Sequence, residues 1–294
     1  MRVAVVGEPA GWHVGRLVAA VAARGHEPTV VPWAAVGARI GRDADGFQPA
    51  ALDGCDIVAV RGMPGAGSPL DRLEEVVFRM DVLGRLAARG TRVVNSPRAL
   101  EVAIDKYLSL SLIAAAGVPV PQTRVVQGTE AAVEAVAELG FPCVLKPLFG
   151  SRGRGLELLA TPAAGAAAVG GTGTVAYLQE FLPHDGWDAR ILVAGDEWFA
   201  MRRLAAAGDW RTNLSLGGRP EAFTPPADWV SLAFRAATAV SAEVAGVDIL
   251  PARDGRAVVL EVNAVPGWRG LEAATGKDVA AAVVRHLESA GRSR

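Results

Sequence analysis

Short apolar runs alternate with amphipathic stretches through the first third of the 294-residue sequence. The runs have the length of buried strands, and the amphipathic stretches have the period of helices. The predicted elements are strand 3–6, helix 12–24, strand 29–31, strand 56–60, helix 70–88 and strand 91–94. This order is a βαβ arrangement, and the break Asn95-Ser96-Pro97 marks its end.

The sequence after Pro97 becomes progressively richer in strands. Two short helical patterns end at Gly117, and a strand, a helix and a strand then lead to Lys146. The later predicted elements are strands 175–182, 188–193 and 198–203, an irregular stretch to Pro226, a long helix, strands around Asp248 and Glu261, and a final helix. Together these elements predict a mixed α/β (α+β) protein.

Composition narrows the function classes. Apolar residues make up 51% of the chain and charged residues 21%, as in folded globular proteins. With 30 basic and 31 acidic residues there is no global positive field, so we expect no nucleic-acid partner. No apolar run is long enough for a membrane span or a signal peptide, and the two cysteines lie in apolar runs as buried thiols do. These features favour a cytoplasmic protein without a membrane partner.

Glycine-rich segments suggest where phosphate binds. Gly7, Gly11 and Gly15 lack the spacing of a dinucleotide-binding motif, and no Walker-type motif occurs. The loop 150–155 interleaves three glycines with Ser151 and two arginines, which suits a phosphate cradle. Only three of the 30 basic residues are lysines, and Lys146 lies in an apolar run just before this loop, where a phosphate would be its partner. The alternatives are a flexible hairpin and a lysine that reaches solvent.

Acidic and amide side chains recur on the late strands. Asp248 lies in one apolar run, and Glu261 and Asn263 share one face of the next. Oxygen ligands on adjacent strands suit Mg²⁺, with Mn²⁺ as an alternative, whereas ordinary polar alternation on a solvated sheet face is the competing interpretation. Asp188 and Arg190 follow the same spacing. Arg202, Arg203, Arg211 and Asn213 add donors, for which a salt-bridged sheet surface is the alternative.

Motifs in a fixed order resemble those of ATP-grasp carboxylate-amine ligases of the RimK type, in the branch that adds glutamate. They are Asn95-Ser96-Pro97, Asp105-Lys106, residues 116–123 and 141–147, the loop 150–155, Gln179-Glu180-Phe181-Leu182, Asp188-Ala189-Arg190, residues 200–203, Arg211-Thr212-Asn213, Gly246-Val247-Asp248 and residues 261–267. They cover about two-thirds of the chain, whereas the first 94 residues match poorly. The resemblance implies a three-lobed ATP-grasp fold with an N-terminal domain at 1–98, a central lobe at 99–178 and a C-terminal lobe at 179–294.

The resemblance also implies residue roles. ATP phosphates would contact Lys106 and Lys146 under the loop that contains Ser151, Gly153 and Gly155, and the 179–182 segment would hold adenine. Asp188, Arg211 and Asn213 would line the nucleotide site, while Asp248, Glu261 and Asn263 would hold magnesium. Arg203 and Arg190 are the hypothesised stabilisers of charge on the transferring phosphoryl group and the tetrahedral intermediate.

The implied reaction joins a carboxylate to an amine through an acyl phosphate. The expected amine is L-glutamate or another amino acid. The expected acceptor is a carboxylate on a protein C-terminus, a carrier protein, or a pterin or furan coenzyme, and a homo-oligomer is expected. After Asn213 the chain has Leu214-Ser215-Leu216, where related ligases often carry a basic residue. The prediction of glutamate as the amine substrate therefore depends only on the resemblance to the glutamate-adding branch. A nucleotide-binding regulatory protein without ligase activity is the alternative from another class.

Overall fold

The first part of the chain forms a parallel sheet. A computed structural model describes residues 1–41, 45–63, 73–150, 153, 155–161, 165 and 175–289. The elements of the first part are β1 (Arg2–Val6), α1 (Trp12–Ala23), β2 (Glu27–Val31), β5 (Ile57–Val60), α2 (Leu73–Ala88) and β6 (Arg92–Val94). The strand order is β2-β1-β5-β6, and every pairing is parallel. The apolar runs therefore predicted these four strands and both helices.

A short hairpin in this part was not predicted. It consists of β3 (Gly37–Arg39) and β4 (Gly46–Gln48), which pair antiparallel. Three residues per strand are too few to show an alternating pattern. The predicted start of the second helix at 70 falls outside the described residues, and the described helix begins at Leu73.

Side-chain caps position two consecutive short helices, α3 (Pro97–Ile104) and α4 (Lys106–Ala115). The Ser96 hydroxyl accepts from the N–H of Ala99 at 3.2 Å, and Pro97 occupies the first turn of α3. The Asp105 carboxylate then accepts from the N–H groups of Tyr107 and Leu108. Capping by Asp105 makes Lys106 the first residue of α4, so its side chain extends from a fixed helix end.

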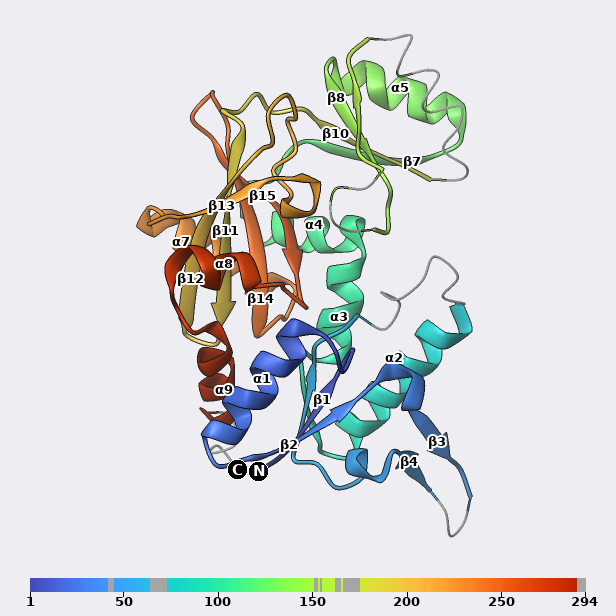
Figure 1. The fold of residues 1–294 in the computed structure, drawn as a ribbon. Helices are drawn as coiled ribbons and strands as arrows, with labels where there is room; N and C mark the ends of the chain where they lie inside the picture. Colours follow the sequence, from blue (N-terminus) through green and yellow to red (C-terminus); the bar gives the residue numbers. More distant parts are fainter. Residues whose placement is uncertain are drawn as a thin grey trace.

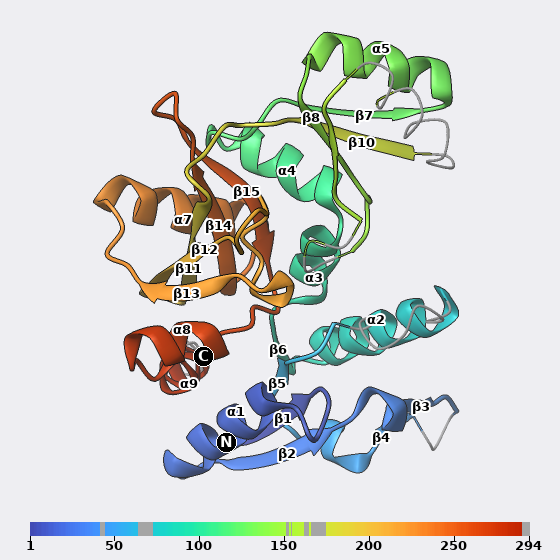
Figure 2. The same cartoon turned by 45° about the horizontal axis from the view of Figure 1, so that its top comes forward.

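The second sheet is antiparallel and carries its own small core. It orders as β7-β10-β8-β9, with α5 packed on one face. Its elements are β7 (Thr123–Gln127), α5 (Thr129–Leu139), β8 (Cys143–Lys146), β9 (Glu157–Leu159) and β10 (Val175–Glu180). Figures 1 and 2 show this unit standing apart from the rest of the molecule, above the C-terminal sheet in the view of Figure 1.

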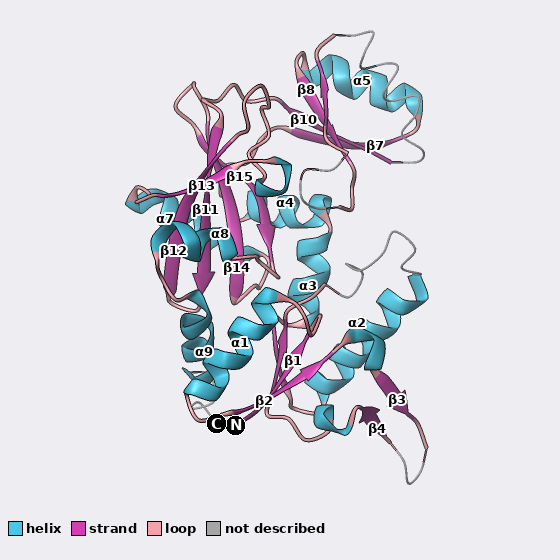
Figure 3. Cartoon of the chain, viewed as in Figure 1, coloured by secondary structure: helices cyan, strands magenta, loops and turns pink. Residues whose placement is uncertain are grey.

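The third sheet is the largest and is antiparallel throughout, in the order β13-β12-β11-β14-β15. The elements of this part are β11 (Trp187–Ala194), β12 (Glu197–Leu204), β13 (Arg219–Ala222), α7 (Ala227–Ala239), β14 (Val244–Pro251), β15 (Ala257–Asn263), α8 (Arg269–Thr275) and α9 (Val279–Ser289). Figure 3 shows how helices cover this sheet, and α7 contacts β11, β14 and β15. The predicted final helix is two helices, because Gly276 adopts a left-handed conformation with φ of 66° that ends α8.

The first and third sheets are joined through the buried side chain of Asn95. Its Nδ2 donates to the carbonyls of Val244 and Ala264 at 2.6 and 2.5 Å, and its Oδ1 accepts from the N–H groups of Glu243 and Val244 at 2.7 and 3.0 Å. Two apolar clusters also contain residues of both sheets. One amide side chain thus fixes the start of β14 and the end of β15 against β6. In the part of the chain that is described, no helix is long and apolar enough to span a membrane.

Asn95→Ala should lower the free energy of unfolding by about 3 kcal/mol, because buried backbone donors and acceptors would lose their partner. Urea unfolding followed by circular dichroism measures this change. Arg98→Ala, which removes an exposed cation one turn later, is the control and should change stability little. Equal stability of the two variants would contradict the proposed importance of the Asn95 joint.

Candidate active site

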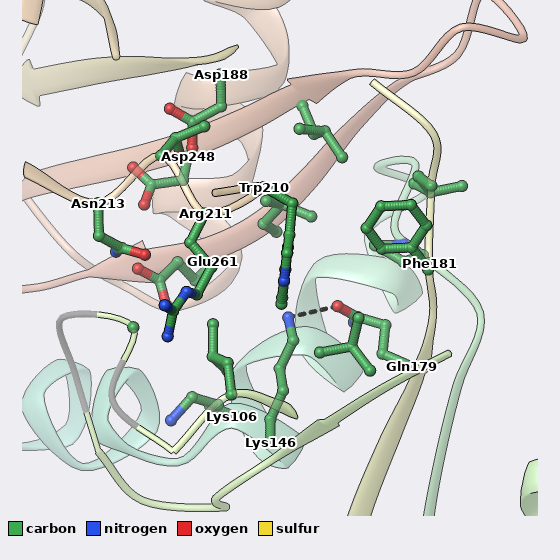
Figure 4. Close-up of a pocket in the computed structure, with 18 of the residues that line it drawn as sticks. Lys106, Lys146, Gln179, Phe181, Asp188, Trp210, Arg211, Asn213, Asp248 and Glu261 are labelled. Atoms are coloured by element: carbon green, nitrogen blue, oxygen red, sulfur yellow. Dashed lines mark hydrogen bonds between the residues drawn. The ribbon is translucent and has the colours of Figure 1, made fainter. Parts of the chain in front are cut away.

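A cleft of about 980 Å³, open to solvent, lies between the second and third sheets. Its walls come from α4, β8 and β10 on one side and from β11, β12, β14 and β15 on the other, with the segment 210–213 between them. In Figure 4, Lys106 and Lys146 lie in the lower part of the view, and Asp248, Glu261 and Asn213 lie above them and to the left. The cleft therefore has a cationic wall and an acidic wall.

The cationic wall consists of two half-buried lysines. Lys146 Nζ donates to Gln179 Oε1 at 2.5 Å, and Gln179 Nε2 in turn donates to Thr123 Oγ1 at 2.9 Å. Lys106 Nζ donates to the carbonyls of Gly150 and Leu148 at 2.8 and 3.4 Å. Burial lowers the pKa of Lys146 to about 8 and also lowers the pKa of Lys106. Among the described residues no carboxylate forms an ion pair with either ammonium, so both can receive an anion.

Gly153 of the glycine-rich loop lies close to Asn213 and Leu216. Gly153 has φ of 69°, and a Cβ built there would lie 2.5 Å from Asn213 Oδ1 and 2.9 Å from Leu216 Cδ1. Only glycine fits this close approach in this conformation. Gly155 also has a positive φ, of 72°. Ser151 lies outside the described residues, as do the two arginines of the loop.

The acidic wall is a ladder of buried ion pairs across four strands. Asp188 and Arg203 are cross-strand partners on β11 and β12, and Arg203 Nε donates to Asp188 Oδ1 at 2.8 Å. Arg203 Nη2 also lies 2.9 Å from Asp248 Oδ2. On the next strand pair, Arg190 donates to both oxygens of Asp248 at 2.6 and 2.7 Å. Arg203, Asp188 and Asp248 are each at most 3% exposed. These three residues therefore form a buried network, and the alternative of a salt-bridged sheet surface does not apply to them.

Glu261 completes this ladder beside Asp248. The two are cross-strand partners, and their carboxyl groups lie within hydrogen-bonding distance. Burial and the Asp248 charge raise the pKa of Glu261. Burial alone would raise the pKa of Asp248 as well, but Arg190 and Arg203 hold it well below its usual range. The Glu261 carboxyl therefore favours a proton or a cation as its neighbour.

The donor set fits a hard divalent cation. Asp248 and Glu261 supply carboxylate oxygens, and Asn263 Nδ2 donates to Glu261 Oε1 at 3.1 Å, so this amide holds Glu261 in place. Such oxygen donors suit Mg²⁺ or Mn²⁺ with phosphate and water oxygens in the remaining positions. No cluster of three acidic, histidine or cysteine side chains that suits a metal occurs among the described residues, so any cation here depends on those other oxygens.

A β-bulge in β15 orients the acidic wall. The register with β14 shifts between Asp248 and Ile249, so Leu260 is the extra residue of β15. Leu260 and Glu261 are neighbours in the sequence, yet both line the cleft. A bulge redirects successive side chains in this way, and no pattern in the sequence indicated it.

Apolar and aromatic residues form the deep end of the cleft near the segment 179–182. Glu180 is held in place by the N–H of Gln122 at 2.8 Å and by Arg256. The Phe181 ring contacts Trp210 edge-on, with 5.7 Å between the ring centroids. Figure 4 shows Trp210 standing in the cleft between Phe181 and Arg211. This end suits a flat, weakly polar group such as a nucleobase.

Most of the predicted site residues meet in this one cleft. Those that line it are Lys106, Lys146, Gly153, Gln179, Glu180, Phe181, Leu182, Asp188, Arg203, Arg211, Asn213, Asp248 and Glu261. Of the remaining described ones, Arg190, Gly155 and Asn263 are not in its lining. Arg211 is turned onto Asp209, with Nη2 to Oδ2 at 2.8 Å.

Sequence reasoning missed several lining residues. They are Pro121, Val144, Pro147, Leu156, Tyr177, His184, Trp210, Thr212, Leu250 and Leu260, whereas Gly150, which also lines the cleft, belongs to the predicted loop 150–155. Strand alternation offered a signal for three of them, since Val144, Tyr177 and Leu250 each lie two positions from a predicted site residue. Trp210 lies in a loop, where periodicity carries no information.

Comparison with known proteins agrees with this geometry. The RimK-like ATP-grasp domain matches residues 103–287. The chain belongs to this family. The match includes both walls of the cleft, and the protein is therefore an ATP-grasp ligase of the carboxylate-amine type, as the sequence motifs predicted.

Similar curated proteins extend over the whole chain. A tetrahydromethanopterin:alpha-L-glutamate ligase of Methanosarcina acetivorans is 31% identical over 96% of this chain and 97% of its own length. A probable alpha-L-glutamate ligase of Xanthomonas euvesicatoria is 34% identical over 94% of this chain and 93% of its own length. The N-terminal sheet is thus shared with these relatives as well.

Solved structures give the same fold. The ATP-grasp ligase PsnB complexed with a minimal precursor has a TM-score of 0.79 and 28% identity, and covers 98% of this chain and 99% of its own. A RimK domain protein from Sphaerobacter thermophilus has a TM-score of 0.74 and 29% identity, with 97% and 99% coverage. The predicted ATP-grasp α/β fold is confirmed.

Gly153→Ala should weaken binding of an ATP analogue by about tenfold, because the added methyl group would clash with Asn213 in a strained backbone conformation. Isothermal titration calorimetry measures this affinity. Gly84→Ala is the matched control, since Gly84 lies in α2 and a Cβ there meets nothing within 4 Å. Unchanged affinity in Gly153→Ala would contradict the close approach.

ATP affinity should decrease as the pH rises above 8. The Lys146 ammonium has a pKa of about 8 in the free protein, and bound phosphate would raise it. Affinity is therefore expected to be constant below this pKa and to fall by up to about tenfold per pH unit above it. Calorimetric titrations across this range test the dependence. The Lys146→Arg variant should bind ATP with an affinity that does not fall over this pH range. A constant ATP affinity above pH 8 in the unaltered protein would refute the proposed role of the Lys146 charge.

Proposed function

We propose that this ligase uses ATP and Mg²⁺ to activate a carboxylate as an acyl phosphate and then joins it to L-glutamate. One observation carries the proposal: two half-buried ammonium groups, which form no ion pair with a described carboxylate, face the Asp248–Glu261 carboxyl pair across a single cleft. A triphosphate with a divalent cation matches this charge arrangement, because the phosphates neutralise the lysines and the cation neutralises the carboxyl pair.

The phosphates are proposed to lie between the two lysines and the glycine-rich loop. Lys146 is already directed by Gln179, and Lys106 ties the start of the loop through Gly150. The adenine is proposed to lie near Phe181, Leu182 and Leu250, which give the deep end its apolar character. This placement aligns the terminal phosphate with the acidic wall.

Asp248 and Glu261 are proposed to hold the cation, with Asn263 supporting Glu261. When bound, the cation neutralises charge on the phosphate oxygens. Arg190 forms a bidentate ion pair with Asp248 and does not line the cleft. We therefore assign Arg190 the role of positioning Asp248, in place of direct stabilisation of charge on the reacting groups. Arg203 lines the cleft, and we retain it as the residue that stabilises charge on the transferring group.

The choice of L-glutamate is supported by the similar proteins that are named alpha-L-glutamate ligases. The proposed acceptor is a carboxylate, and the Methanosarcina acetivorans relative favours a pterin-type coenzyme as the first compound to test. Ligation of another amino acid is the second candidate, because PsnB, a ligase of closely similar structure, is complexed with a precursor peptide.

A release assay for ADP tests the proposed reaction. The protein, ATP and Mg²⁺ are incubated with candidate acceptors, with and without L-glutamate, and the product is identified by mass spectrometry. We expect ADP release that requires both acceptor and amine, and a product heavier by one glutamyl residue. Amine-independent ADP release without an amide product would refute ligation, and a product with another amino acid would refute the choice of glutamate.

Glu261→Gln should reduce turnover by about 100-fold or more, because the amide keeps the shape of the side chain but removes the charge that favours a cation. Steady-state ADP release at saturating Mg²⁺ measures the loss, and thermal unfolding confirms that the variant folds. Glu157→Gln changes an exposed carboxylate on β9 and is the matched control. Full activity of Glu261→Gln would remove this residue from the cation site.

A further inference from the structure

A second group of cationic and aromatic side chains lies outside the cleft, where the first sheet meets the segment that follows β15. We call it the Arg61 cluster. Its members share the junction between the ends of β1 and β5, the start of α1 and the segment 264–269: Trp12, His13, Arg61, Trp268 and Arg269. The segment 264–269 directly follows Asn263, so the cluster is connected to the acidic wall by a short piece of chain.

Arg61 is a cation without an anion. Its Nη2 donates to the carbonyl of Pro266 at 2.9 Å, and its guanidinium lies over the Trp268 ring, 4.1 Å from the centroid. Among the described residues no carboxylate pairs with it, and its enclosed Nε has no hydrogen-bond partner. Buried charges are normally paired, so Arg61 lacks the partner that its position demands.

Trp268 presents a second unused donor next to the first. Its side chain is completely buried, and its Nε1 has no hydrogen-bond acceptor. Only two buried side-chain nitrogen or oxygen atoms of the described residues lack a partner, and these two atoms belong to stacked side chains. Two N–H donors on stacked side chains, one of them on an unpaired cation, therefore lack acceptors at this junction, and a negatively charged group with two oxygens has the chemistry to supply them.

The surrounding groups add positive charge near Arg61 and His13. Arg269 is exposed, forms no ion pair with a described residue and lies near the Trp12 ring. His13 accepts from the N–H groups of Trp268 and Arg269 through Nε2, at 2.9 and 3.3 Å, which fixes its ring as neutral. Burial, Arg61 and Arg269 also lower the pKa of His13 to about 4, in keeping with a positive surrounding.

The backbone near Arg61 leaves little room for other residues. A Cβ at Gly7 would lie 3.1 Å from Val14 and 3.2 Å from the Arg61 carbonyl carbon. Gly7 and Arg61 follow β1 and β5, and the carboxyl ends of parallel strands are where open α/β sheets bind ligands. The start of α1 is directed to the same edge, and a helix start favours negative charge.

We propose that the Arg61 cluster binds a carboxylate of a ligase substrate, held by Arg61 and Trp268 near the end of β15, the strand that carries Glu261. A planar carboxylate matches a guanidinium and an adjacent N–H donor better than a phosphate does. The assignment to a substrate rests on the proposed function. The carboxylate belongs either to the amino acid that supplies the amine or to the acceptor, and both sources share this chemistry.

Binding of two probes distinguishes these sources. L-Glutamate represents the amine substrate, and N-acetyl-L-glutamate represents an acceptor carboxylate without a free amine. Each is titrated calorimetrically into the protein in the presence of Mg²⁺ and a non-hydrolysable ATP analogue. Arg61→Met should weaken binding of one probe by about 10- to 100-fold, because a charged hydrogen bond is lost. The probe that is affected identifies the source.

The same variant separates ligand binding from a structural role. Arg61→Met keeps the length of the side chain and removes an unpaired buried charge, so we expect an unchanged or higher Tm and an unchanged affinity for the ATP analogue. Arg269→Gln should weaken the same probe by about threefold, as an exposed charge does. Arg98→Gln removes an exposed cation that is paired with Glu101 and should change nothing.

Several results would overturn the proposal. The first is that neither probe binds to the unaltered protein. The second is that Arg61→Met binds both probes as tightly as the unaltered protein does, and the third is that inorganic phosphate binds whereas the carboxylate probes do not. If Arg61→Met does not fold, unchanged probe affinity in Arg269→Gln would also overturn the proposal. Probe binding that depends on Arg61, without ADP release for any amine, would refute the proposed function alone. Glutamate ligation with unchanged KM values in Arg61→Met would refute this site alone.

Discussion

The buried ion-pair ladder across β12, β11, β14 and β15 is the constraint on which the acidic wall depends. Its members are Arg203, Asp188, Asp248, Arg190 and Glu261, three carboxyl groups against two guanidinium groups. Removing a single partner from such a network leaves a buried charge uncompensated, at a cost of about 3–5 kcal/mol. The unequal count leaves one carboxyl group without its own cation, and that group is Glu261 at the cleft.

The two lysines of the cationic wall belong to different packing units. Lys146 ends a strand of the second sheet, which packs on α5 around its own cluster. Lys106 begins α4, which packs on α7 and β15 in the apolar cluster that the third sheet shares with the first. A ligand that carries phosphates and a cation would therefore contact both packing units at once.

The sequence predicted the strands that bear the site but not the contacts between them. Apolar runs mark β8, β10, β14 and β15, since burial on both faces leaves a continuous signal. Register is a relation between strands, so the pairing of Asp188 with Arg203 and the bulge at Leu260 could not be read from either strand alone. The strands β3, β9 and β13 are too short for a pattern, and Trp210 lies in a loop. Gly153 was recognised as part of a loop, but its contact with Asn213 depends on tertiary structure.

The net charge of −1 does not show which cationic side chains are paired with acids and which are not. Many arginines are paired with acids on the surface, as Arg285 is with Glu197, whereas Lys106, Lys146 and Arg61 are half-buried and form no ion pair with a described carboxylate. The choice of residue follows from burial. Burial lowers the pKa of Arg61 to about 9, which leaves the guanidinium charged at neutral pH. A lysine, with an ordinary pKa of about 10.4, would lose much of its charge under the same burial. Lys146 tolerates its position because Gln179 contacts it and the cleft opens to solvent. At Arg61 the side chain keeps its charge because a guanidinium starts from a higher pKa than an ammonium does.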